Sequence, residues 1–587
     1  MDTHTILGLH GQRLETQLRF IYGDRADEAM TLVTERLSRR VSGLKDVRRS
    51  EMDVSKAPSF SERDALLISY GDMIGTGQSQ GINAPSALSR LGTFIDNRCS
   101  GIFSYHHILP FFPYSSDDGF SVMDYRAVDP ALGTWDDIAR LGKKRRLAFD
   151  LVINHASAQG VWFKAFKAGR KPFNKFFITR PLDYDASSVL RPRTHPLISS
   201  VIMDDGSTIG VWTTFSADQV DLDFSEPEVF AEYVDIILEY AQRGARMLRL
   251  DAIAYLWKED GTSCAHLPEV HAVVKAIRAI LDGLKLDMLV LTETNVPHEE
   301  NMAYFGNGDE AHMVYNFSLP PLTLHAFATG DAEPLSTWAA ALTVPAGATM
   351  LNFLASHDGV GVTPARGLVE NFDETILAVQ ARGGLVSYKG TPQGPVPYEL
   401  NISWADAVSR PEADDVERSK ALIASYAVAC AMDGVPALYF HSIVGSRNWK
   451  EGPESLGYNR AINREKPTMA MLEEALSDPH SMRSLSLKGL SSLLRQRAKR
   501  PAFAPGAARK AYVSAGSVFM VERGSGKDAM LVAINCSHQA VSCTLPEFWR
   551  TASSAFDPVE ARSVSLETQH GVTTVPAYGV LWIENKA

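Results

Sequence analysis

Cysteine is scarce in this chain of 587 residues. The five cysteines are odd in number and no two form a Cys-x-x-Cys pair, so the sequence predicts neither a disulfide framework nor a cysteine zinc site. They are Cys99, Cys264, Cys430, Cys536 and Cys543. A reducing cytoplasm is the simplest compartment for such a chain.

Long apolar runs are absent as well. No stretch reaches the ~20 apolar residues that a membrane-spanning helix needs. Residues 1–20 lack the basic segment and the apolar core of a secretory signal. We therefore expect a cytoplasmic protein without a membrane partner.

Positive charge is in the minority, since 58 Lys and Arg face 69 Asp and Glu, which gives a formal net charge of −11. This balance disfavours nucleic acid as a partner, although a local basic pocket for a small anion stays possible. The content of 45% hydrophobic and 22% charged residues is typical of a globular protein. The length favours one large domain with smaller ones. The oligomeric state, monomer or homodimer, stays open.

Eight short apolar runs alternate with amphipathic stretches along most of the chain. Helical patterns separate most of the runs, for example at 227–244 and 267–284. Eight strands with intervening helices predict an α/β fold of the TIM-barrel type, whose active site lies at the carboxyl ends of the strands. The runs are 65–74, 101–113, 146–155, 246–256, 287–295, 312–320, 349–358 and 434–442.

The spacing of these runs predicts the domain organisation. Residues 1–60 form a helical extension, and residues 61–500 form the barrel domain. Two gaps between runs are too long for plain helical crossovers: 156–224 reads as an inserted B subdomain, and 364–416 as an inserted B′ loop subdomain rich in Gly and Pro. Residues 501–587 form an antiparallel β domain, because short strands alternate at 511–523, 529–537, 540–545 and 580–585.

An arginine and an aspartate stand two residues apart in the fourth run. Side chains two apart on a strand point to the same side, so Arg249 and Asp251 face one space. A lone pair of this kind is usually a structural or surface ion pair. Here the flanking residues are apolar, and burial makes an unpartnered carboxylate costly. The pattern therefore indicates an aspartate that Arg249 holds ionised and aimed.

Further polar residues end the neighbouring runs. Asp150 and His155 end the third run, Glu293 the fifth, and His357 with Asp358 the seventh. Each of them alone is more often a structural residue or a helix cap. Their joint occurrence at the predicted catalytic end of a barrel favours an active site.

Paired carboxylates without a metal-binding pattern favour glycoside chemistry, in which one attacks the anomeric carbon and another protonates the leaving oxygen. Asp251 suits the nucleophile. Glu293 suits the acid/base, because burial and nearby acids raise its pKa. Asp358 would bind sugar hydroxyls, with His155 and His357 donating hydrogen bonds. A metal site is the alternative, but HExxH and DxDxDG patterns are absent, so we expect no metal and no cofactor.

Four blocks, DLVINH, RLDAIAYL, TETN and ASHDGVG, resemble the four signature regions of the α-amylase superfamily of retaining glycosidases and transglycosidases. The resemblance covers residues 61–587. It implies that Asp251 is the nucleophile, Glu293 the acid/base and Asp358 the transition-state stabiliser. It also implies that three further residues bind glucose, namely His155, Arg249 and His357.

Finer motifs resemble the sucrose phosphorylase-like branch, a group within glycoside hydrolase family 13. In ILPFFPYSSDDGFSVMDY (108–125), Asp117 would bind the far side of the glucose ring and Phe120 would wall the pocket. In GYNRAINRE (457–465), Arg460 would pair with that aspartate. In FSADQVDLDF (215–224), Phe215 and Gln219 would line the site. A pocket closed on this side admits one glucosyl unit.

The branch also implies an acceptor side. LRPRTHP (190–196) resembles the loop that supplies a phosphate-binding arginine, here Arg193, and an exposed surface loop is the alternative. Sucrose phosphorylases carry a Tyr-Gln pair in the acceptor loop, whereas this chain reads PYELNI (397–402). This segment implies acceptor contacts from Tyr398, Glu399 and Asn401.

The departure from Tyr-Gln puts sucrose in doubt as the substrate. The long N-terminus and the segments GGLVSYK, PYELN and GSRNWKEG resemble glucosylglycerate phosphorylases of the same branch. We expect phosphorolysis of 2-O-α-glucosylglycerate to α-glucose 1-phosphate, with a cation, not chosen by the sequence, on the acceptor carboxylate. Sucrose 6′-phosphate, sucrose and glucosylglycerol are the alternative substrates within this class. A hydrolase or isomerase and a non-catalytic binding protein are the alternatives outside it.

Overall fold

A closed barrel of eight parallel strands forms the centre of the computed structural model, which describes residues 2–47, 60–77, 84–391, 394–568 and 570–585. Each strand overlaps one of the eight apolar runs, so the predicted TIM barrel is confirmed. In their order around the barrel the strands are β1 (Leu66–Ser69), β2 (Tyr105–Ile108), β3 (Arg146–Val152), β9 (Ala245–Asp251), β10 (Leu289–Thr292), β11 (Met313–Tyr315), β12 (Thr349–Phe353) and β16 (Val435–Tyr439).

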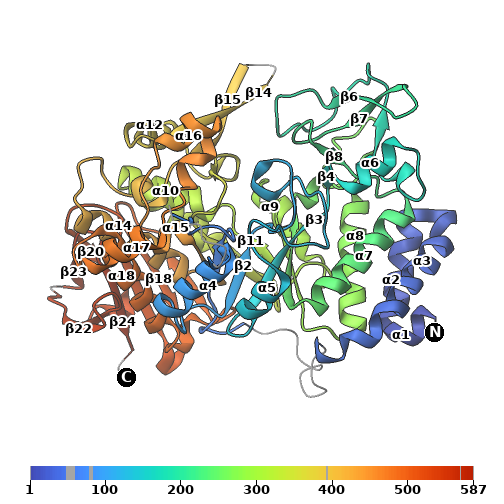
Figure 1. Ribbon diagram of the computed structural model, residues 1–587. Coiled ribbons are helices and arrows are strands. Elements are labelled where there is room, and N and C mark those ends of the chain that lie inside the picture. The colour runs from blue at the N-terminus through green and yellow to red at the C-terminus, as the bar shows by residue number, and fades with distance from the viewer. Residues whose placement is uncertain (1, 48–59, 78–83, 392–393, 569, 586–587) are drawn as a thin grey trace.

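Helices surround the barrel and cover its outer face (Figure 1). The strands are buried almost throughout, which explains why they read as continuous apolar runs rather than alternating ones. The two helices expected at 227–244 and 267–284 are α7 (Pro227–Gln242) and α8 (Pro268–Gly283), each with proline in its first turn. The others include α4 (Ala87–Arg98), α5 (Trp135–Gly142), α9 (His298–Met302), α10 (Leu319–Thr329), α11 (Glu333–Ala341), α14 (Asp415–Ala431), α15 (Phe440–Ile443), α16 (Glu451–Leu456), α17 (Met469–Ser477) and α18 (Met482–Arg497).

The N-terminal helices form a second layer outside α7 and α8 (Figure 1). They are α1 (Thr3–Leu7), α2 (Leu9–Tyr22) and α3 (Ala26–Arg40), of which α2 packs on α8 and α3 on α7. Leu14 and Leu37 of this layer are fully buried. Arg40 donates to both carboxylate oxygens of Asp235 at 2.8 and 2.7 Å. The extension therefore supports the helices on either side of β9, the strand that ends at Asp251.

Two insertions rise from the same end of the barrel (Figure 1). The first follows β3 and holds β4 (His155–Ser157), α6 (Val161–Lys167), β5 (Thr179–Arg180), β6 (Ile198–Ile202), β7 (Thr208–Trp212) and β8 (Gln219–Asp221). The second follows β12 and holds β13 (Val360–Gly361), α12 (Asp373–Ala381), β14 (Leu385–Thr391), β15 (Gly394–Asn401) and α13 (Trp404–Ala407). Strands β14 and β15 form a hairpin with a register shift between Ser387 and Tyr388.

The C-terminal region is an antiparallel β domain, as expected, but its strands differ from the prediction. The run 511–523 is not one strand, because the chain turns near Gly516, at a φ of 96°, and pairs β17 with β18. Three strands, β21 to β23, were not predicted. Exposed residues are frequent in β22 and β23, and β21 has only one fully buried residue, so none of the three reads as a buried apolar run. The strands are β17 (Arg509–Tyr512), β18 (Val518–Arg523), β19 (Met530–Asn535), β20 (Val541–Thr544), β21 (Ser554–Asp557), β22 (Arg562–Ser565), β23 (Val572–Val575) and β24 (Val580–Glu584).

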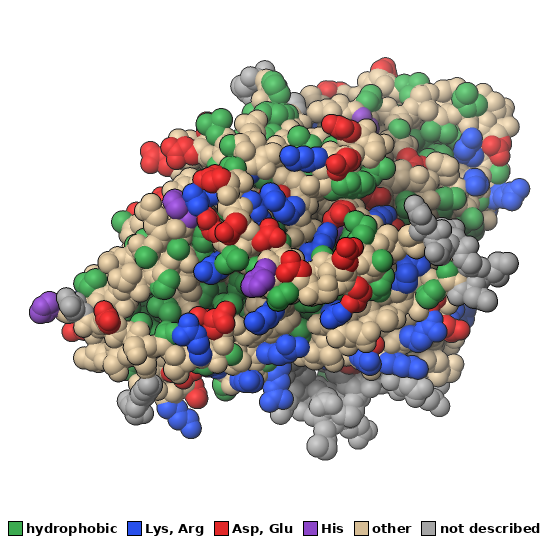
Figure 2. All heavy atoms as spheres, turned by 60° about the vertical axis from the view of Figure 1, so that its left-hand side comes forward, with side chains coloured by type: hydrophobic (Ala, Val, Ile, Leu, Met, Phe, Trp, Pro, Cys, Tyr) green, Lys and Arg blue, Asp and Glu red, His purple; other side chains and the backbone are tan. Residues whose placement is uncertain are grey.

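The distribution of charged side chains and the state of the cysteines agree with what the composition indicated. Acidic and basic side chains are interspersed across the middle of the face shown in Figure 2. All five cysteines are free thiols, and four of them are buried. Within the described residues, no helix has the length and apolar character needed to cross a bilayer.

Candidate active site

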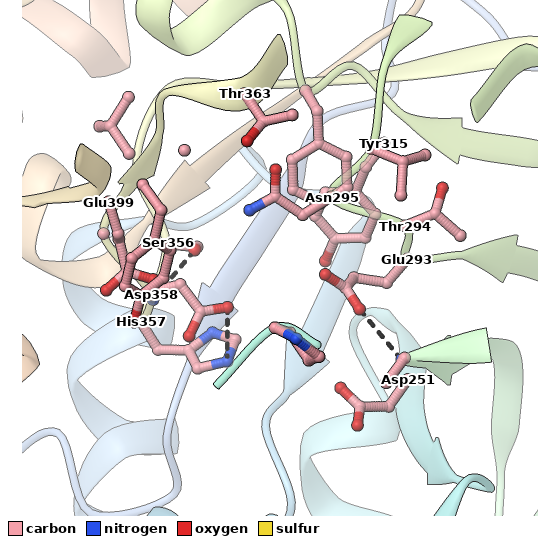
Figure 3. Close-up of a pocket in the computed structure, with 18 of the residues that line it drawn as sticks. Asp251, Glu293, Thr294, Asn295, Tyr315, Ser356, His357, Asp358, Thr363 and Glu399 are labelled. Atoms are coloured by element: carbon pink, nitrogen blue, oxygen red, sulfur yellow. Dashed lines mark hydrogen bonds and ion pairs between the residues drawn. The ribbon is translucent and has the colours of Figure 1, made fainter. Parts of the chain in front are cut away.

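A cavity of about 370 Å³ opens at the carboxyl end of the barrel strands, beneath the two insertions. Asp251, Glu293 and Asp358 all line it. Figure 3 shows Asp251 and Glu293 on one side of the cavity, and Asp358 beside His357 on the other. We call the part around these carboxylates the inner half. The outer half is the part lined from the insertions by Arg193, Phe215, Lys389 and Tyr398.

Asp251 is the last residue of β9, where a chain of charges orients it. The Arg249 guanidinium, 2% exposed, donates from Nη1 to Asp251 Oδ1 at 2.8 Å and also to Asp150. Asp150 in turn contacts His107 Nε2 at 2.7 Å. Burial opposes the negative charge of Asp150, but Arg249 and His107 outweigh it and lower the pKa of Asp150. Arg249 is thus fixed between two carboxylates and presents Asp251 to the cavity.

Glu293 lies next to Asp251, because the backbone N–H of Ala252 donates to Glu293 Oε2 at 3.0 Å. Burial raises the pKa of both carboxyl groups, and it outweighs the opposing effect of Arg249 on each. The pair therefore holds a proton to higher pH than two ordinary carboxyl groups would. Arg249 contacts Asp251 at 2.8 Å but Glu293 only at 3.9 Å, so the negative charge is favoured on Asp251 and the proton on Glu293.

Asp358 is the ionised carboxylate of the opposite wall. Burial opposes its charge, yet the guanidinium groups of Arg460, Arg464 and Arg249 lower the pKa of Asp358 well below its usual range. Arg460 forms ion pairs with Asp358 and with Glu399. The expected ion pair of Arg460 with Asp117 is absent from the described residues, since the guanidinium is taken by these two closer carboxylates.

The remaining predicted glucose residues also line the cavity, all in the inner half except Phe215, which lies in the outer half. The Phe120 ring stacks on His357 with centroids 4.9 Å apart and planes 6° apart. Burial lowers the pKa of His357 to about 3, so this imidazole is neutral. Gln219 donates to Asp117 Oδ2 at 3.1 Å and contacts His155 Nε2 at 3.2 Å. These polar groups surround a space whose arginines, Arg249 and Arg460, are already paired with carboxylates.

Arg193 lies in the outer half between two aromatic rings. Its guanidinium carbon is 5.8 Å from the Phe215 ring centroid and 5.7 Å from that of Tyr398. Its Nη1 donates to the Tyr398 hydroxyl at 3.4 Å, a long hydrogen bond. No carboxylate of the described chain pairs with Arg193. The loop therefore brings a cation to the cavity, as the sequence predicted.

Two predicted acceptor residues are placed differently from the expectation. Glu399 lines the cavity, but both of its oxygens accept hydrogen bonds from Arg460, at 3.0 and 2.6 Å. It therefore positions Arg460 rather than offering a free carboxylate. Asn401 is fully buried and is not part of the cavity lining; its amide donates to the Ser387 hydroxyl at 3.0 Å.

Sequence reasoning missed two residues of this site. His107 stands in the buried second run, and the pair of histidines inside an apolar strand was the available signal. Lys389 lines the outer half, but the sequence indicated its segment, GGLVSYK, only through a resemblance to glucosylglycerate phosphorylases and gave this residue no role. The described residues contain no group of three His, Cys, Asp or Glu that could hold a metal ion.

The comparisons with known proteins agree with this geometry. The α-amylase catalytic domain model matches residues 103–399. A glucosylglycerate phosphorylase from Spirochaeta thermophila is 46% identical over 538 residues, which cover 89% of this chain and 89% of that protein. The chain belongs to the α-amylase family, in its sucrose phosphorylase-like branch.

Two further members of the α-amylase family are less similar to this chain than that protein is. A sucrose phosphorylase from Agrobacterium vitis is 30% identical over 461 residues, covering 74% of this chain and 88% of that protein. The solved structure of sucrose 6F-phosphate phosphorylase from Thermoanaerobacter thermosaccharolyticum has a TM-score of 0.69 at 24% identity, covering 81% of this chain and 94% of that one. At that identity, the structural likeness shows the α-amylase fold alone.

Proposed function

We propose that this chain is a retaining glycoside phosphorylase that cleaves 2-O-α-glucosylglycerate with inorganic phosphate. The products are α-glucose 1-phosphate and glycerate. The observation that carries this choice is the 46% identity to a glucosylglycerate phosphorylase, against 30% to a sucrose phosphorylase. Arg193, which has no carboxylate partner among the described residues, supports an anionic co-substrate at the outer half.

The first step transfers the glucosyl group to the protein. The Asp251 carboxylate attacks the anomeric carbon while Glu293 gives its proton to the departing glycerate oxygen, so the glycosidic bond breaks and an ester forms. Arg249 holds Asp251 in place for this attack. Asp358, kept ionised by Arg460, supports the positive charge that develops on the sugar ring.

The second step returns the glucosyl group to phosphate. Glu293, now ionised, accepts a proton from phosphate, whose oxygen attacks the anomeric carbon and releases Asp251. Two inversions give net retention, hence the α-anomer of glucose 1-phosphate. Arg193 binds the entering phosphate, since a guanidinium fork matches two phosphate oxygens.

The test is a panel of α-glucosides incubated with and without phosphate, with glucose 1-phosphate and free glucose both measured. We expect glucosylglycerate to be consumed only when phosphate is present. Consumption without phosphate would indicate a hydrolase or isomerase. Turnover of sucrose, sucrose 6′-phosphate or glucosylglycerol in preference to glucosylglycerate would overturn the substrate.

We also propose a cytoplasmic location and small-molecule partners only, namely the α-glucoside and phosphate. The five free thiols support a reducing compartment. Fluorescence of the tagged protein in its host cell tests the location.

A further inference from the structure

Five cations line the catalytic cavity, and most of them already have a partner. Arg249 contacts Asp150 and Asp251, and Arg460 contacts Asp358 and Glu399. The Arg191 guanidinium donates to the backbone carbonyl of His195. The remaining two share the outer half. They are Arg193, whose partners in the described chain are the neutral oxygens of the Tyr398 hydroxyl and the Pro192 carbonyl, and Lys389.

Lys389 lies on β14, and within the described part of the chain its ammonium group has neither a hydrogen bond nor an ion pair. In the hairpin it is opposite Val396. Tyr398, the residue that the register shift leaves without a cross-strand partner, lines the same cavity as Lys389. Its side chain is half-buried. Burial and the nearby Arg366 lower the pKa of Lys389, an effect that an anion beside the ammonium would offset.

The reaction proposed above brings two different anions to the outer half in turn. Glycerate must leave before phosphate attacks the glucosyl ester, because both use the same face of the anomeric carbon. Arg193 is held between Phe215 and Tyr398, which suits planar, bidentate binding of phosphate. Lys389 differs: an ammonium on a flexible stem is a compact point charge that binds one carboxylate without a fixed plane.

We propose that Lys389 binds the carboxylate of the glycerate unit and so determines the preference for an acidic acceptor. This inference rests on the proposed function. It predicts a division between the two cations: Lys389 serves the acceptor acid, and Arg193 serves phosphate. A neutral acceptor of the same size, glycerol, offers nothing for the ammonium to bind.

The test is the reverse reaction, from α-glucose 1-phosphate to either glycerate or glycerol, in the wild type, Lys389→Gln and Lys389→Arg. In Lys389→Gln, we expect kcat/KM for glycerate to fall roughly 10- to 100-fold, because a hydrogen bond to a charged group is lost. The kcat/KM for glycerol should change little. Lys389→Arg should recover part of the glycerate activity, because it keeps the charge. The KM for phosphate in phosphorolysis should stay within about 3-fold of the wild-type value.

Arg366→Gln is the matched control, because Arg366 is an exposed cation that influences Lys389 without lining the cavity. It should leave the ratio of glycerate to glycerol activity unchanged. An unchanged ratio of glycerate to glycerol activity in Lys389→Gln, which includes an equal fall of both activities, would overturn the role of Lys389. Failure of the wild type itself to use glycerate would instead overturn the proposed function, so the two failures are distinguishable.

Discussion

The inner and outer halves of the cavity treat charge in opposite ways. In the inner half, Arg249 is held by Asp150 and Asp251, and Arg460 by Asp358 and Glu399. In the outer half, Arg193 and Lys389 have no carboxylate partner among the described residues. The three carboxylates of the inner half, Asp251, Glu293 and Asp358, come at or after the ends of barrel strands, whereas the outer half is carried by the two insertions.

This difference suits the two parts of the proposed substrate. A neutral glucosyl group needs groups fixed in advance around the anomeric carbon, and paired charges in a rigid barrel provide them. An anion needs a region of uncompensated positive charge, which a net negative protein must create locally. The lesson is that the charge of a ligand can be inferred from which cations the protein has left unpaired.

The largest expected effect comes from breaking the inner half at Asp251. Asp251→Asn should lower kcat roughly 10⁴- to 10⁶-fold, because no covalent ester can form. Steady-state phosphorolysis measures the loss, and circular dichroism checks that the variant remains folded. Phosphorolysis at a tenth of the wild-type rate in a folded variant would refute the nucleophile.

The next effect comes from replacing the acid/base. Glu293→Gln should slow glucosylglycerate phosphorolysis by roughly 10²- to 10⁴-fold, since the leaving glycerate oxygen is no longer protonated. Fluoride leaves α-glucosyl fluoride without needing a proton from Glu293. Release of fluoride from this substrate should therefore be much less affected. If both substrates slow equally, Glu293 has a different role.

A smaller effect tests whether Glu399 positions Arg460 or contacts the acceptor. Glu399→Gln should reduce kcat/KM by about 10-fold for glycerate and glycerol alike, because a neutral amide holds Arg460 less firmly. Glu412→Gln, in the exposed pair that Arg410 and Glu412 form at 2.8 Å, is the control and should have little effect. A loss confined to glycerate would place Glu399 on the acceptor.

The smallest expected effect is the pH dependence of the first step. Burial raises the pKa of Glu293, and the negative charge of Asp358 adds to this against the opposing Arg249. The protonated, active form therefore persists to higher pH than for an ordinary glutamate, and kcat/KM falls as the pH rises through the raised pKa. A profile of kcat/KM against pH measures this limb, which Glu293→Gln should abolish.

The barrel and the catalytic carboxylates were predictable from the sequence for the same reason. Buried parallel strands are nearly all apolar, so the eight runs stand out, and the polar residues at their ends stand out with them. Asp251, Glu293 and Asp358 were found in this way, and the structure brings them into one cavity.

Pairings between distant segments were not predictable. The sequence related Arg460 to Asp117, but the hairpin carries Glu399 to within 2.6 Å of Arg460, and Asn401 turns away from the cavity into the protein. Which member of an alternating strand faces a ligand depends on register, and the irregularity between Ser387 and Tyr388 shifts it. Lys389 was missed for the same reason.

The register shift between Ser387 and Tyr388 divides the β14–β15 hairpin into two parts with different roles. On the barrel side of it, Glu399 fixes the arginine of the inner half. Tyr398 lies at the irregularity and Lys389 beyond it, and both line the outer half. The far part of the hairpin contributes nothing to the barrel, so it can change without disturbing the chemistry below. Acceptor preference in such an enzyme can therefore diverge, or be redesigned, by exchanging a short surface segment while the machinery that handles glucose is inherited unchanged.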